Sequence, residues 1–104
     1  MVENTSRLNY IQKIVDILVN IRNRINPETD VVWTSFTTPK QLIESINAYI
    51  KSLQEGDYEV LGNLSMMFAP TGIYQELSIS NGWGEDFLQL SDQFDKCLER
   101  FRSI

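Results

Sequence analysis

The end of the chain carries the pattern that most restricts its fold, because large apolar residues there recur in steps of four, three, four, three and four. The six residues are Trp83, Phe87, Leu90, Phe94, Cys97 and Phe101. This spacing puts them on one face of an α-helix and is typical of a helix that packs along an apolar seam. Acidic Glu85 and Asp86 lie near its start and basic residues near its end, as the helix dipole favours. The sequence therefore predicts a final helix that begins near Trp83.

A second long helix is predicted from about Thr5 or Ser6 to about Ile25. Its apolar residues also recur at spacings of three and four: Leu8, Ile11, Ile14, Val15, Leu18, Ile21 and Ile25. Ile17 widens this face, so we expect a central helix that contacts two neighbours. Pro27 ends it, because the residue before a proline is pushed out of the α region. Arg22, at the edge of the face, is expected to pair with an acid of another helix, such as Glu44.

Two shorter helices are predicted between these. Thr38-Pro39-Lys40-Gln41 supplies an N-cap, a proline at the first helical position and a glutamine that can close a capping box. Gly56 can take the left-handed conformation that ends this helix. Asp57 then caps a third helix, Glu59 suits the positive end of its dipole, and Pro70 ends it.

The two connections are harder to interpret. Residues 27–37 are apolar for a loop, so we expect them to lie across one end of the bundle with Trp33 partly buried. In residues 70–82, Ile73, Gln75, Leu77 and Ile79 resemble the start of a strand, whereas Ile73, Tyr74 and Leu77 also fit one turn of helix. We therefore predict an all-α fold: a single domain spanning residues 1–104, a small irregular bundle of about four helices with a long ordered loop before the last one.

The composition argues against several classes of function. The chain has no histidine, which is the commonest general base and metal ligand, and it has no glycine-rich phosphate loop or CxxC motif. We therefore expect a non-enzymatic protein without a cofactor. The acidic stripe Glu85, Asp92, Asp95 and Glu99 is explained by surface pairs such as Asp92 with Lys96, so no metal is expected.

The cellular setting is inferred from two other features. The single cysteine, Cys97, cannot form an internal disulfide and lies on the core seam, where it acts as a small hydrophobic residue. The polar N-terminus does not resemble a signal peptide, and no apolar stretch approaches the ~20 residues needed to cross a bilayer. We expect a cytoplasmic protein that does not bind membranes.

Charge is distributed unevenly along the chain. The segment from Ser52 to Asp95 has no lysine or arginine but has eight acids, whereas the whole chain has a net charge of −5. Those acids are Glu55, Asp57, Glu59, Glu76, Glu85, Asp86, Asp92 and Asp95. If they adjoin in space, they form a surface that attracts a basic protein and repels nucleic acid. The alternative is that several of them only complement helix dipoles.

A candidate anchor lies between two turn residues, at Gly82-Trp83-Gly84. Tryptophan and tyrosine are enriched at interface hot spots, so Trp83 and Tyr74 are plausible contacts. Trp83 also fits as the first core residue of the last helix, and both roles can coexist if its ring is half exposed. The predicted partner-binding residues are Tyr74, Glu76, Trp83, Glu85 and Asp86, with Asp57 and Glu59 behind them.

One stretch, MFAPTGIYQELSISNGWG at residues 67–84, resembles a segment of small helical bacterial proteins, some of them similar to immunity proteins of polymorphic toxin systems. The resemblance covers roughly residues 57–95 and carries over no functional residue. It implies binding and blocking of a cognate toxin, with an acidic surface suited to a basic nuclease. Two alternatives stay open: a structural homo-oligomer that pairs through the wide face of the first helix, and an enzyme that works through carboxylates.

Overall fold

The computed structural model describes the backbone of residues 2–103 and the side chains of residues 6–103. Within this part of the chain there are five helices and no strand: α1 (Val2–Asn23), α2 (Pro39–Gln54), α3 (Val60–Phe68), α4 (Ile73–Ser80) and α5 (Gly84–Arg102). The prediction of a small all-α bundle is confirmed. None of these helices is both long and apolar enough to cross a membrane.

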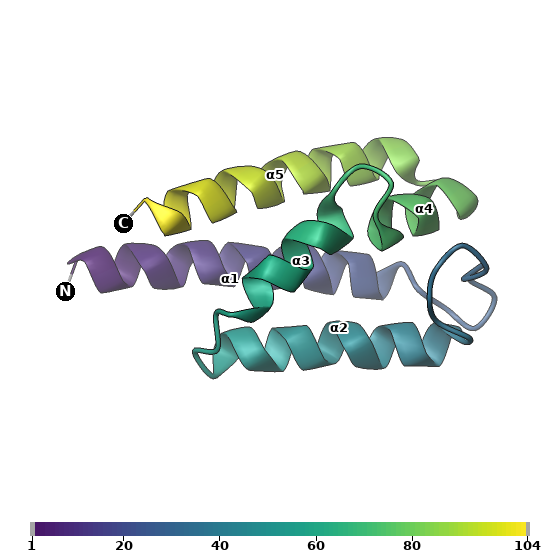
Figure 1. Ribbon diagram of the computed structural model, residues 1–104, viewed down its shortest axis with the longest axis horizontal. Helices are drawn as coiled ribbons and strands as arrows, with labels where there is room; N and C mark the ends of the chain where they lie inside the picture. Colours follow the sequence, from purple (N-terminus) through teal and green to yellow (C-terminus); the bar gives the residue numbers. More distant parts are fainter. Residues whose placement is uncertain (1, 104) are drawn as a thin grey trace.

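The helix α1 lies between α2 on one side and α5 on the other, while α3 crosses the bundle and α4 packs beneath the start of α5 (Figure 1). The molecule is elongated, with extents of 45 × 25 × 19 Å. The broad apolar face of α1 is buried from Ile11 to Ile25, which confirms the central position expected for it. Leu8, which was expected on this face, is exposed.

The ends of α1 differ from the prediction by a few residues. The helix already begins at Val2, before Thr5 and Ser6, and it ends at Asn23. Its last turn tightens, because the amides of Arg24 and Ile25 donate to carbonyls three residues back.

The start and end of α2 follow the predicted signals. Thr38 is the N-cap, and its hydroxyl accepts a hydrogen bond from the Gln41 amide at 3.2 Å. The Gln41 side chain accepts from the amide of Thr37 at 2.9 Å, one residue before the donor of a standard capping box. Gly56 follows the helix with φ +85°, the left-handed conformation that glycine adopts without strain.

The helix α3 begins three residues later than Asp57. The Asp57 carboxylate accepts a hydrogen bond from the Glu59 amide at 3.3 Å, so it stabilises the turn before the helix instead of capping the helix itself. The helix ends at Phe68, and Ala69 and Pro70 follow in the turn.

The stretch that the sequence left undecided, residues 70–82, contains the helix α4. The Gly72 amide donates to the Ala69 carbonyl at 2.8 Å, and the Thr71 amide donates to the Gln75 side chain at 2.8 Å, which closes the turn before Ile73. Tyr74, Leu77 and Ser78 are buried. The helical alternative is therefore the right one, and the expected long loop is reduced to a short turn on each side of α4.

Aromatic rings form the centre of the core where α3, α4 and α5 meet. The Phe68 ring stacks on Phe94 with centroids 4.1 Å apart and on Phe87 at 5.9 Å, and it meets Tyr74 edge-on at 5.1 Å. The predicted seam of α5 is confirmed from Phe87 to Phe101, since all its apolar members are buried.

The connection between α1 and α2 is fastened to the turn that follows α4. The Asn81 side chain accepts a hydrogen bond from the Asp30 amide at 2.8 Å and donates to the Asp30 carbonyl at 2.9 Å. The connection lies at one end of the bundle, as predicted (Figure 1). Trp33, however, is 69% exposed, so its predicted partial burial is wrong.

Candidate functional site

A hollow of about 550 Å³ lies where α4 turns into α5 and contains three of the predicted contact residues. We call this surface the acidic corner. It is lined by Gln75, Ile79, Gly82, Trp83, Gly84, Glu85, Asp86 and Leu88.

The corner is shaped by a tight turn between the two helices. Gly82 adopts φ +84°, which a residue with a side chain rarely takes. The Trp83 amide then donates to the Ser78 carbonyl at 2.9 Å, and the Trp83 carbonyl accepts from the Phe87 amide at 3.0 Å. Trp83 is therefore fixed as the N-cap residue of α5, where it lines the hollow.

Trp83 is half-buried, so the two roles considered for it can coexist. Its ring meets Phe87 edge-on at 6.4 Å, which ties it to the core. The guanidinium of Arg24 lies 5.1 Å from the ring centroid, a cation–π distance. The same guanidinium forms an ion pair with Asp86 at 3.1 Å, and its Nε donates to Asn20 at 2.9 Å. Arg24 therefore holds the tryptophan and one acid of the corner in place.

The predicted acids do not converge on one surface. Glu85 and Asp86 are exposed at the acidic corner, and Glu76 lies on α4 outside the lining of the hollow. Asp57 and Glu59 lie on the connection from α2 to α3, where Tyr58 meets Phe101 near the end of α5, whereas Glu85 and Asp86 lie in the first turn of that helix (Figure 1). The predicted contact residues are therefore not gathered around one hollow.

Basic residues outside the acidic segment also neutralise part of its charge. Glu55 pairs with Lys51 at 3.9 Å, Asp86 with Arg24 at 3.1 Å, and Asp92 with Lys96 at 2.9 Å. The last of these is the surface pair that the sequence predicted. Glu85 has no ion-pair partner among the side chains that the structure describes, so it carries the uncompensated charge at the corner.

Two exposed apolar residues of the hollow were missed by sequence reasoning. Ile79 is 58% exposed and Leu88 is 59% exposed, and both line the hollow. The exposure of Leu88 could have been predicted from the sequence, because Leu88 lies outside the apolar seam through which α5 packs. Exposed Val32 and Trp33 belong to the connection that Asn81 fastens next to this corner.

Tyr74 lies in the core instead of on this surface. It is 1% exposed, so it drops out of the proposed contact residues. Its hydroxyl has no hydrogen-bond partner among the described residues. Burial, and to a lesser extent Tyr49, raise the pKa of Tyr74 well above its ordinary value.

We expect Tyr74→Phe to raise the free energy of unfolding by about 1 kcal/mol, because it removes a buried hydroxyl that forms no hydrogen bond. Tyr58→Phe, at a half-buried ring, should change stability by less than about 0.5 kcal/mol.

Since the raised pKa of Tyr74 keeps it neutral in the folded state, the wild type should lose stability as the pH rises above the ordinary value of 10.0. Urea unfolding at pH 7 and pH 10.5 measures both effects, and an equal alkaline loss in Tyr74→Phe would contradict the assignment.

The remaining sequence predictions concern single side chains. Arg22 donates to the Asn47 side chain at 2.8 Å, so its partner is an amide on α2 instead of Glu44. Cys97 is buried on the seam as predicted, and burial raises the pKa of its thiol. Among the described residues, no group of three or more acidic or cysteine side chains is placed to hold a metal ion.

Comparison of the chain with protein-family models, with curated proteins and with solved structures finds no match. No match bears on the resemblance of residues 57–95 to immunity proteins, so the case for any function depends on the geometry of the acidic corner.

Proposed function

We propose that the chain is a non-enzymatic protein-binding module whose acidic corner binds a basic protein. Its most concrete form is immunity-type inhibition, in which the chain covers and blocks a basic toxin domain. One observation carries the proposal: Glu85, exposed Ile79 and Leu88, and half-buried Trp83 surround a single hollow. We place this activity in the cytoplasm, where a lone thiol such as Cys97 stays reduced.

The chemistry of the corner matches that of a binding hot spot. Interface hot spots are centred on aromatic and apolar anchors that lose water on binding. Ile79 and Leu88 supply exposed apolar surface, and the Trp83 ring is already held in place by Arg24 and Phe87. Because this ring is fixed in advance, little side-chain entropy is lost when a partner covers it.

Charge would act mainly on the rate of binding. The chain carries a net charge of −5, and Glu85 adds an unpaired carboxylate next to the apolar surface. Such a field speeds the approach of a cationic partner, and salt screens it. The same field disfavours nucleic acid as a ligand.

The homo-oligomer alternative is less well supported than it was from the sequence. It relied on the wide apolar face of α1 as a surface for a symmetry mate. The residues of that face from Ile11 to Ile25 are already buried within the single chain, each with 7% exposure or less. From Ile11 onward, the described part of α1 therefore leaves no corresponding apolar stripe for a second copy, although Leu8 is exposed.

The test is capture of a partner from the source organism at low salt, followed by association kinetics with the purified partner. Glu85→Lys should lower the association rate constant about tenfold and weaken its dependence on salt. Glu59→Lys is the matched control, because it makes the same charge change next to Tyr58, which meets Phe101 near the end of α5, and it should alter the rate by less than about twofold.

Equal effects of the two variants would show that only net charge matters and would contradict a specific corner. The immunity form has its own readout, which is growth of cells that express the captured partner with or without the chain. Growth restored by the wild type and not by Glu85→Lys supports inhibition through this surface. A partner that is harmless when expressed alone would contradict the immunity form.

A further inference from the structure

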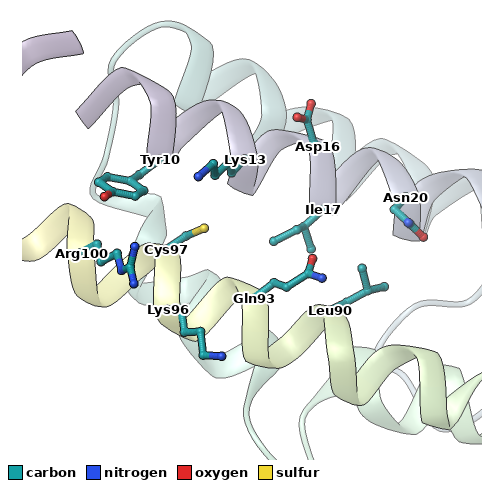
Figure 2. A pocket seen from close by; sticks show the side chains of 10 residues that line it. All are labelled: Tyr10, Lys13, Asp16, Ile17, Asn20, Leu90, Gln93, Lys96, Cys97 and Arg100. Carbon is teal, nitrogen blue, oxygen red and sulfur yellow. The ribbon is translucent and has the colours of Figure 1, made fainter. Parts of the chain in front are cut away.

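A second hollow, of about 470 Å³, lies between α1 and α5 and is separate from the acidic corner (Figure 2). Its apolar part is formed by Ile17 of α1 and by Leu90 and Cys97 of α5, all of which are buried residues. The half-buried ring of Tyr10 adds aromatic surface at one end. We call this hollow the α1–α5 groove.

The charged side chains around the groove are mostly basic. Figure 2 shows Lys13 of α1 and Arg100 of α5 on the two sides of the space beside Cys97. Neither forms an ion pair with any side chain that the structure describes. Lys96 also lines the groove, but it points away from α1 and pairs with Asp92 at 2.9 Å.

The one acid that lines the groove, Asp16, does not neutralise these cations. Its side chain points away from α5 (Figure 2). It accepts a hydrogen bond from the Gln12 side chain at 2.9 Å. The positive charges of Lys13 and Arg100 also act on the Cys97 thiol at the floor of the groove. Burial raises the pKa of the Cys97 thiol, while Lys13 and Arg100 act in the opposite direction. The Lys13 ammonium also lies 5.4 Å from the centroid of the Tyr10 ring, a cation–π distance. In a chain with a net charge of −5, two cations without an ion-pair partner among the described side chains form a site of the opposite sign over an apolar floor.

We infer that the α1–α5 groove binds a small organic anion with an apolar body. The anionic group lies between Lys13 and Arg100, and the apolar body covers Ile17, Leu90 and the Tyr10 ring. The volume of the groove falls within the range of ligand pockets, which are mainly apolar with a few polar groups that fix orientation. This site does not depend on the proposed function, since it lies on other residues and selects the opposite charge.

The test uses the full chain and two fluorescent probes that share an aromatic framework. One is 8-anilinonaphthalene-1-sulfonate, which is anionic, and the other is N-phenyl-1-naphthylamine, which is neutral. Lys13→Gln with Arg100→Gln should weaken binding of the anionic probe about tenfold or more, because each lost cation removes a charge-assisted contact. Lys40→Gln with Lys51→Gln removes the same charge from α2 and should leave binding within about twofold.

The only cysteine of the chain provides an independent readout at the groove. Saturating anionic probe should slow alkylation of Cys97 by iodoacetamide several-fold, because the thiol lies on the floor beneath the proposed ligand. The inference is overturned if the two double variants weaken binding equally, if the neutral probe binds as tightly as the anionic one, or if bound probe leaves alkylation unchanged. Circular dichroism of each variant measures whether it keeps the helical fold, so a loss of binding can be distinguished from unfolding.

Discussion

Phe68→Ala is expected to lower the free energy of unfolding by about 3–5 kcal/mol. Phe68 is 2% exposed and is the ring on which three helices meet. It stacks on Phe94 with an interplanar angle of 6° and on Phe87 with 13°, and it meets Tyr74 at 81°. Alanine removes all three aromatic contacts at once and leaves a cavity that rings on separate helices cannot easily fill. Since a domain of this size is stable by only about 5–15 kcal/mol, the loss is a large part of that margin.

The measurement is urea unfolding followed by circular dichroism, and the matched control is Met66→Ala on the same helix. Met66 is 73% exposed, so its truncation should change stability by less than about 0.5 kcal/mol. A loss below about 2 kcal/mol for Phe68→Ala would show that α3 is not anchored through this ring.

Some helices could be predicted from the sequence and others could not, for physical reasons. The helix α5 was predictable because its seam spans many turns, and the start of α2 because Thr38 and Pro39 act within a single turn. The helix α4 was not, because its eight residues hold too few apolar positions to separate a helix from a strand. Its packing is decided by Tyr74 against Phe68, a contact that no local pattern contains.

The candidate site was predictable only in part for a similar reason. Trp83, Glu85 and Asp86 are neighbours in sequence, so they were bound to lie together at the start of α5. Asp57 and Glu59 were grouped with them by charge, but α3 crosses the bundle and keeps them apart. The contribution of Ile79 and the pairing of Asp86 with Arg24 depend on how α4 and α1 pack against α5. The Arg24–Asp86 pair joins residues 62 positions apart, and the place of Ile79 depends on the angle between two successive helices.

Gly72→Ala is expected to destabilise the protein by about 3 kcal/mol, through crowding and not through backbone conformation. Its φ of −74° suits any residue. A Cβ added here, however, would lie 2.5 Å from the Met66 carbonyl oxygen, 2.7 Å from that of Met67 and 2.8 Å from that of Ala69. All three are backbone atoms, so relief requires the end of α3 to move away from the start of α4. That movement would also disturb the packing of Tyr74 on Phe68.

Gly62→Ala is the matched control, and it should have the opposite sign. Gly62 lies inside α3, is exposed, and has no atom within 4 Å of an added Cβ. Alanine there should stabilise the protein by about 0.5–1 kcal/mol, because glycine is a poor helix former and loses more backbone entropy on folding. Urea unfolding of the two variants should therefore differ by about 4 kcal/mol for the same added methyl group. A similar free energy of unfolding for both would mean that the turn at residues 69–72 yields easily, and that α4 is not held against α3 by the close approach at Gly72.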